Sequence, residues 1–106
     1  MAVLRETELD RLRETILTIL RPYQVKRVAL FGSVVRGEDA PGSDLDILVT
    51  LPPPGERPVI GLKWIDLAEE LSLLLDRPVD LVTEDGLSPY IRPHIEKEMV
   101  VLYEQA

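Results

Sequence analysis

The segment Asp44–Thr50, which reads DLDILVT, constrains the fold more than any other part of the chain. Successive side chains of a strand point to opposite faces, so three aliphatic residues share one face while Asp44 and Asp46 share the other. The aliphatic face suits a hydrophobic core, whereas two carboxylates are not buried without compensation. The sequence predicts a strand that buries one face and presents two carboxylates side by side on the other.

Hydrophobic periodicity divides the rest of the chain into helices and strands. Apolar residues at three- and four-residue steps predict helices, and short β-branched apolar runs predict strands. The predicted helices are Thr7–Leu20, Val59–Asp76 and Ser88–Glu98, with a helical turn at Ser33–Gly37; the predicted strands are Val25–Phe31, Asp44–Thr50, Pro78–Thr83 and Met99–Tyr103. This order predicts an α/β (α+β) domain in which helices flank a small sheet of about four strands.

Two of the predicted helices carry more detailed expectations. Ser88 and Pro89 suit the N-cap and first position of the last helix, because serine caps well and proline needs no N–H there. The long central helix is expected to bury one apolar stripe. Its members are Trp64, Leu67, Ala68, Leu71, Leu74 and Leu75.

Length and charge narrow the classes of protein. The 106 residues suit one domain, 1–106, with no room for a separate substrate-binding domain. Twelve basic and nineteen acidic residues give a net charge of −7, which opposes direct binding to a nucleic acid backbone but not to a small phosphorylated ligand with its cations. No cysteine, signal peptide or long apolar run is present, so we expect a cytoplasmic protein without a membrane partner.

Three acidic residues stand at strand positions where the pattern favours apolar ones. Asp44 and Asp46 share a face of one predicted strand, and Asp80 lies in the next. Carboxylates grouped this closely repel one another, and a divalent cation removes the repulsion. Mg²⁺ is usually held by one or two carboxylates with water and phosphate oxygens, and such clusters can hold two ions for a phosphoryl displacement. The sequence therefore predicts a magnesium site, with two ions expected.

A possible phosphate-binding turn precedes that site. Gly32 and Ser33 directly follow a predicted strand, where glycine allows close approach of a ligand and the N–H groups of the next turn can bind an anion. Arg36 lies one turn further on and can contact phosphate, or can instead pair with Glu38 or Asp39. Gly-Ser and Asp-x-Asp are each common as a plain turn and a solvated strand end. Their joint spacing on strand, turn and strand favours a nucleotide site.

The run LFGSVVRGEDAPGSDLDILV resembles the signature of the DNA polymerase β-like nucleotidyltransferase superfamily. The short chain and its terminal LSPYIRPHIEKEMVVLYE segment resemble the minimal nucleotidyltransferases (MNT), which are often paired with a HEPN-domain protein in prokaryotic toxin–antitoxin modules. The resemblance implies a mixed sheet with a polymerase β palm-like fold. It also implies that Gly32 and Ser33 hold nucleotide phosphates and that Asp44 and Asp46 ligate Mg²⁺. Asp80 would complete the metal site or help to deprotonate the attacking hydroxyl.

The resemblance further implies an activity, because some members transfer AMP from ATP to a tyrosine of the HEPN partner and so silence a toxic RNase. We therefore predict a Mg²⁺-dependent nucleotidyltransferase that modifies a hydroxyl of a HEPN-domain partner. Two alternatives stay open. One is an antitoxin that neutralises its partner by binding alone. The other is a nucleotidyltransferase subunit acting on a small molecule, such as an aminoglycoside, in a pocket that a homo-oligomer would complete.

Overall fold

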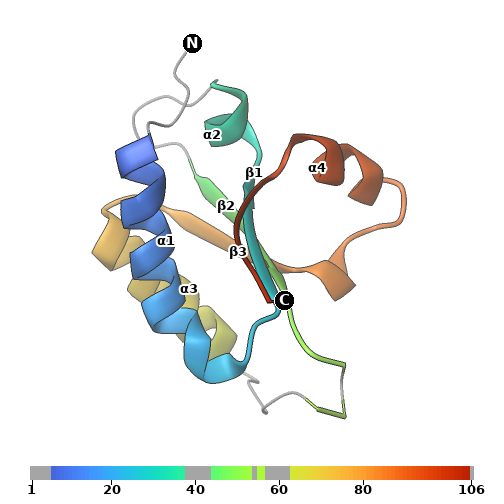
Figure 1. Cartoon of the computed structure of the whole chain (residues 1–106), viewed down its shortest axis with the longest axis horizontal. Coiled ribbons are helices and arrows are strands. Elements are labelled where there is room, and N and C mark those ends of the chain that lie inside the picture. Colours follow the sequence, from blue (N-terminus) through green and yellow to red (C-terminus); the bar gives the residue numbers. More distant parts are fainter. Residues whose placement is uncertain (1–5, 38–43, 54, 57–62, 106) are drawn as a thin grey trace.

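Helices lie on both faces of a four-stranded sheet in the computed structural model, which describes residues 6–37, 44–53, 55–56 and 63–105 (Figure 1). The elements in chain order are α1 (Glu6–Leu20), the 3₁₀-helix η1 (Arg21–Tyr23), β1 (Arg27–Phe31), α2 (Ser33–Arg36), β2 (Leu45–Thr50), α3 (Lys63–Leu75), β3 (Val79–Thr83), the 3₁₀-helix η2 (Glu84–Gly86), α4 (Arg92–Glu98) and β4 (Val100–Glu104). The predicted order of helices and strands is confirmed.

The sheet is mixed, with the strand order β3-β2-β1-β4. β1 runs antiparallel to β2 and β4, whereas β2 and β3 are parallel and are joined by α3. In this register Asp46 of β2 lies opposite Phe31 of β1 on one side and opposite Asp80 of β3 on the other. The topology therefore brings Asp46 and Asp80 together and places Asp46 beside the end of β1, where the Gly-Ser turn begins.

The larger hydrophobic core fills the space between the sheet and the pair α1 and α3, which cover the same face in Figure 1. On the sheet side, this core is lined by alternate side chains of the central strands β1 and β2. Its buried residues are Ile16, Leu17, Leu20, Val25, Val28, Leu30, Val34, Leu45, Ile47, Val49, Leu67, Leu71, Leu81 and Leu102. A fully buried aliphatic side chain contributes about 1.5–3 kcal/mol to the free energy of folding. This larger core therefore provides most of the hydrophobic stabilisation of the sheet.

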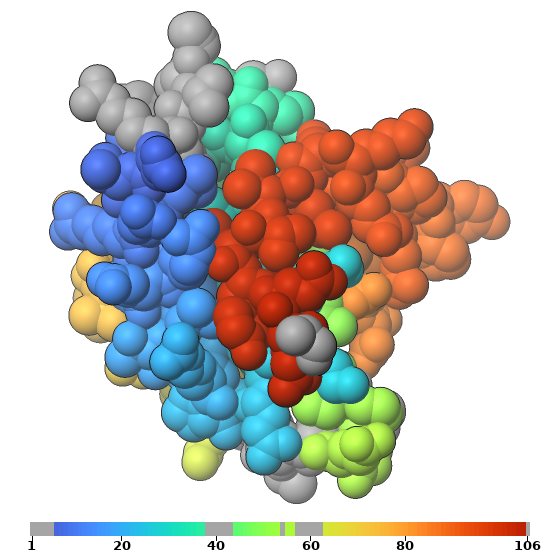
Figure 2. All heavy atoms as spheres, in the orientation of Figure 1, coloured from blue at the N-terminus to red at the C-terminus, as the bar shows by residue number. Residues whose placement is uncertain are grey.

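The opposite face of the sheet carries α4 and a smaller apolar cluster. Ala29, Leu48 and Ile95 are its buried members. The edge strand β4 is also attached to α1, since Arg13 Nε donates a hydrogen bond to the carbonyl of Leu102 (2.7 Å). Figure 2 shows α1 beside β4, with α4 and the segment before it standing out from the other side of the molecule.

The start of α4 differs from the prediction. Ser88 does not cap the helix: its Oγ accepts a bond from the N–H of Tyr90 (3.2 Å) within a separate turn, and α4 begins at Arg92. Pro93 has no N–H and cannot bond to the carbonyl of Pro89, so a regular helix is interrupted there. Regular helix starts where Pro93 falls in the first turn, a position at which its missing N–H has no cost.

Smaller differences concern the other elements. β2 begins at Leu45, so Asp44 directly precedes the strand and is not part of it. Leu74 does not belong to the buried stripe of α3, because it lies at the margin of that stripe and its side chain is 53% exposed. The predicted helix residues 59–62 and the predicted loop 38–43 lie outside the described residues. Among the helices that are described, none combines the length and apolar character needed to span a bilayer.

Candidate active site

Asp46 is the central residue of the candidate site. It lies in the interior strand β2, on the α4 face, and is partly buried. Burial raises the pKa of its carboxyl group above the ordinary value of 3.8, and the negative charges of Asp80, Asp44 and Glu98 raise it further, while Arg36 lowers it. The protein alone therefore does not compensate the charge of Asp46, as expected of a carboxylate that acts on a ligand.

The two other predicted carboxylates lie near Asp46 in more exposed positions. Asp80 is its register partner in the parallel pair, where neighbouring strands lie about 4.8 Å apart, so both side chains leave the sheet on the same side. Asp44 is exposed just before β2, two residues from Asp46. The charges of both residues raise the pKa of Asp46.

The described residues contain no group of three or more His, Cys, Asp or Glu side chains arranged to hold a metal ion. The three aspartates are therefore neighbours without forming a ready-made cage. Mg²⁺ does not require one, since it usually takes one or two carboxylates and completes an octahedron with water and phosphate oxygens. Oxygen donors beside an uncompensated Asp46 fit a hard divalent cation held by Asp46 with either Asp44 or Asp80.

Gly32 brings the backbone against this carboxylate. A Cβ atom on Gly32 would lie 2.1 Å from Oδ2 of Asp46, so no other residue fits here without moving the carboxylate. The backbone of Gly32 (φ 84°, ψ −156°) also falls in a region that is essentially restricted to glycine. Its carbonyl accepts hydrogen bonds from the N–H groups of Val35 and Arg36, which start the short helix α2. The Gly-Ser turn is therefore in direct contact with Asp46.

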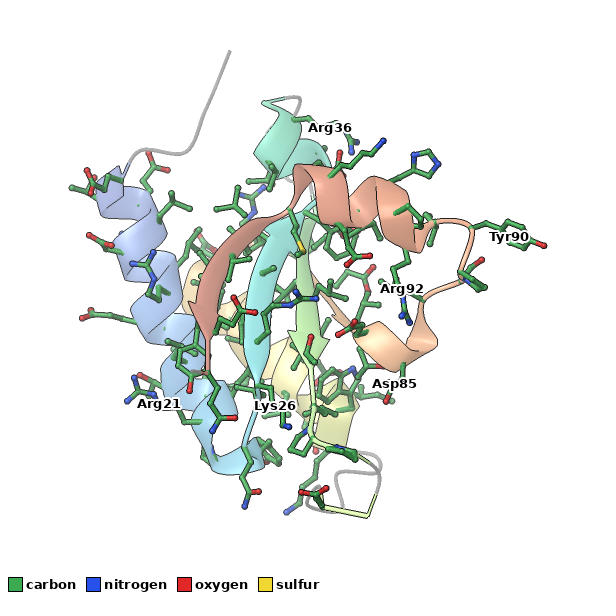
Figure 3. The ribbon with its side chains drawn as sticks, turned by 45° about the vertical axis from the view of Figure 1, so that its right-hand side comes forward. Arg21, Lys26, Arg36, Asp85, Tyr90 and Arg92 are labelled. Atoms are coloured by element: carbon green, nitrogen blue, oxygen red, sulfur yellow. The ribbon has the colours of Figure 1, made fainter. Side chains whose placement is uncertain are left out.

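Glu98, the last residue of α4, is part of this site and was not predicted from the sequence. Its Oε1 accepts hydrogen bonds from the N–H of Gly32 (3.2 Å) and from Nη1 of Arg36 (3.0 Å), and Nη1 also lies 3.2 Å from Oε2. Figure 3 shows Arg36 above the C-terminal end of α4. The sequence left two alternatives for Arg36, namely contact with phosphate or an ion pair with Glu38 or Asp39. In the structure Arg36 forms an ion pair with Glu98, whereas Glu38 and Asp39 lie outside the described residues. A helix end disfavours an acidic residue, and this was the signal that the sequence offered.

A second polar group lies at the far end of the same face. Thr50 Oγ1 donates to Oε2 of Glu84 (2.6 Å), and Nη2 of Arg27 lies 3.6 Å from the same oxygen. Arg92 Nη2 donates to the carbonyl of Glu84 (3.0 Å), which attaches the start of α4 to η2 (Figure 3). These contacts hold α4 over the sheet, and so fix the other end of the helix, where Glu98 meets the Gly-Ser turn.

Comparison with known proteins agrees with this geometry. Residues 9–102 match the family model of the nucleotidyltransferase domain. The protein adenylyltransferase MntA of Thermococcus cleftensis is 38% identical over 101 residues, which cover 94% of this chain and 98% of that protein. A solved structure described as a candidate minimal nucleotidyltransferase is 33% identical, with a TM-score of 0.71 and coverage of 94% of this chain and 98% of that one.

A second similar structure contains a nucleotide analogue. It is the crystal structure of a toxin–antitoxin pair with AMP-PNP, which is 25% identical with a TM-score of 0.74 and covers 88% of this chain and 73% of that one. The solved structures agree with the fold, and the family model and the relative agree with the resemblance found in the sequence. This chain belongs to the nucleotidyltransferase domain family, in the branch of the minimal nucleotidyltransferases.

Proposed function

We propose that this chain transfers AMP from ATP to a hydroxyl group of a partner protein, and that the partner is a HEPN-domain toxin. The observation that carries the proposal is the contact between Gly32 and Asp46, because it joins an anion-binding turn to an uncompensated carboxylate. A nucleotide triphosphate and its cation need this combination. We place the reaction in the cytoplasm, where ATP is available.

Each group has a role in this proposal. Gly32, Ser33 and Arg36 bind the phosphates of ATP, through backbone N–H groups, a hydroxyl and a guanidinium. Asp44 and Asp46 hold Mg²⁺, with two ions expected, which when bound neutralises charge on the reacting phosphate. Asp80, which faces Asp46 across the parallel pair, completes that site or accepts the proton of the attacking hydroxyl.

The acceptor is supplied by another protein in this proposal. Most of the described residues belong to the sheet, its helices and the site, which leaves little of that part of the chain for an acceptor pocket. The relative from Thermococcus cleftensis is named as a protein adenylyltransferase, and a similar structure is that of a toxin–antitoxin pair. Both support a protein acceptor over a small molecule.

Transfer of label from [α-³²P]ATP tests the proposal directly. The protein is incubated with labelled ATP, Mg²⁺ and the product of the neighbouring gene, and the double variant Asp44→Asn/Asp46→Asn is compared with the parent. We expect label on the partner, with a loss of about 1,000-fold in the variant, because charge neutralisation contributes most of the catalysis of phosphoryl transfer.

A matched control is Asp66→Asn/Glu69→Gln, which removes the same charge from exposed positions of α3 and should leave labelling intact. The proposal is wrong if the partner carries no label while the Asp44→Asn/Asp46→Asn variant still neutralises it. That result would establish an antitoxin that acts by binding alone.

A further inference from the structure

The carboxylate of Glu98 occupies two donors of the Gly-Ser turn at once. Its Oε1 lies 3.2 Å from the amide nitrogen of Gly32 and 3.0 Å from Nη1 of Arg36. An N–H group and a guanidinium that converge on one carboxylate form an anion site, and here the anion belongs to the protein itself. The two donors come from α2 and the residue before it, whereas the carboxylate comes from the end of α4, more than 60 residues along the chain.

Glu98 and a nucleotide phosphate cannot both accept the N–H of Gly32. The backbone N–H of Gly32 carries a single hydrogen, which Glu98 accepts in this structure. A phosphate brought to the turn would also meet the negative charge of Glu98, beside that of Asp46. Phosphate binding at the N–H of Gly32 therefore requires the carboxylate of Glu98 to leave.

The fold allows the side chain of Glu98 to leave without moving the helix. The backbone next to it is fixed, since the N–H of Met99 bonds to the carbonyl of the buried Ile95 (2.9 Å) and β4 begins at Val100. The side chain of Glu98 is 27% exposed and that of Arg36 is 44% exposed, so rotation of the Glu98 side chain carries its charge into solvent. No other described part of the chain has to rearrange.

We propose that Glu98 is an internal competitor of the nucleotide phosphates: it closes the phosphate-binding turn of the empty protein and is displaced when a polyphosphate enters. Every ligand that uses the two donors must first break the contacts that Glu98 makes with them. A ligand with several phosphate oxygens can replace those contacts, so Glu98 selects for such ligands. A ligand without phosphate gains nothing from the turn. The inference rests on the proposed function, since it takes the turn to be the triphosphate site.

A structural role for Glu98 predicts the opposite result. If its carboxylate served only to hold Gly32 and Arg36 in position for the phosphates, its loss would weaken nucleotide binding. If Glu98 competes with the phosphates, its loss strengthens binding. The sign of the change in affinity therefore separates the two roles.

The experiment is calorimetric titration of the wild type and of Glu98→Gln with AMP-PNP and Mg²⁺, with inorganic triphosphate and with adenosine. The substitution keeps the shape of the side chain and removes its charge. We expect AMP-PNP and inorganic triphosphate to bind about threefold to tenfold more tightly, since a partly exposed ion pair has to be broken in the wild type alone. Adenosine should bind equally to both proteins.

Glu96→Gln is the matched control, because Glu96 lies on the same helix and is exposed, and its loss changes the net charge equally. Its affinity for AMP-PNP should stay at the wild-type value. Unchanged or weaker binding of AMP-PNP by Glu98→Gln overturns the inference and leaves the proposed function intact, as does an equal gain for adenosine or for Glu96→Gln. Failure of every one of these proteins to bind AMP-PNP overturns the proposed function and this inference with it.

Discussion

The two faces of the sheet differ in what they are built to do. The face covered by α1 and α3 is lined by aliphatic side chains, whereas the α4 face combines the small cluster around Leu48 with carboxylates and arginines. Both faces are made by the same strands, since Ile47 and Leu48 are adjacent in β2 and point opposite ways. Strand alternation thus lets one short segment supply the core and the active site.

The difference shows how a chain of this length can hold an uncompensated carboxylate. Asp46 is in an interior strand, so its backbone is fixed from both sides by hydrogen bonds to β1 and β3. The burial on the α1/α3 face stabilises that strand, and the α4 face can then keep groups that do not favour folding. Stability and activity should therefore respond separately to substitutions on the two faces.

The largest expected effect on folding comes from the core face. Ile47→Ala should lower the free energy of unfolding by roughly 4 kcal/mol, and Leu48→Ala by roughly 2 kcal/mol, within the usual range for such truncations. Both side chains are buried, but Leu48 belongs to a cluster with only two other buried members, which can close around the cavity more easily. Urea unfolding followed by circular dichroism measures both values. Equal losses would show that the two faces contribute alike.

The separation of the faces could be predicted from local sequence. In α1 the apolar period matched the helix, and in β1 and β2 short apolar runs matched the strands. The start of α4 could not be predicted in the same way, because Ser88 offered a good cap while Pro93 decided where regular hydrogen bonding begins. Local preferences conflicted there, and the pattern gave no means to rank them.

The role of Glu98 could not be predicted for a different reason. Its partners Gly32 and Arg36 are more than 60 residues away, and a glutamate on a short helix normally faces solvent. Only the pairing of β4 with β1 brings the end of α4 to the Gly-Ser turn. An acidic residue at a helix end was a local signal, but it did not identify the distant partners of Glu98, so the site motifs were found while the group that occupies them was missed.

The next largest expected effect is on AMP transfer, and it arises where the Gly-Ser turn contacts Asp46 of β2. Gly32→Ala should reduce AMP transfer about 100-fold, because its Cβ would lie 2.1 Å from Oδ2 of Asp46 and a shift of about 1 Å in a reacting group has an effect of this size. Label transfer to the partner at saturating ATP measures the loss. Gly55→Ala is the control, since a Cβ there meets nothing within 4 Å. Wild-type activity in Gly32→Ala would show that the close approach is not needed.

The smallest expected effect is a gain in stability from Asp46→Asn in the absence of metal. The folded protein holds the pKa of Asp46 above its ordinary value of 3.8. At a pH between 3.8 and this raised pKa, Asp46 is protonated in the folded state and ionised in the unfolded state. The free energy of unfolding of the wild type therefore falls as pH rises through that interval and stays lowered above it. Asparagine carries no charge and escapes this penalty. At neutral pH the variant should be slightly more stable than the wild type.

The gain should disappear as pH falls below 3.8, where Asp46 is protonated in both states of the wild type. Thermal unfolding of both proteins in EDTA, at a series of pH values, measures the difference. Asp44→Asn should give a smaller gain, because Asp44 is exposed and its charge acts on Asp46 only as a neighbour. A variant that is less stable than the wild type at neutral pH would mean that the Asp46 carboxylate helps to hold the fold together. The α4 face would then serve stability as the α1/α3 face does.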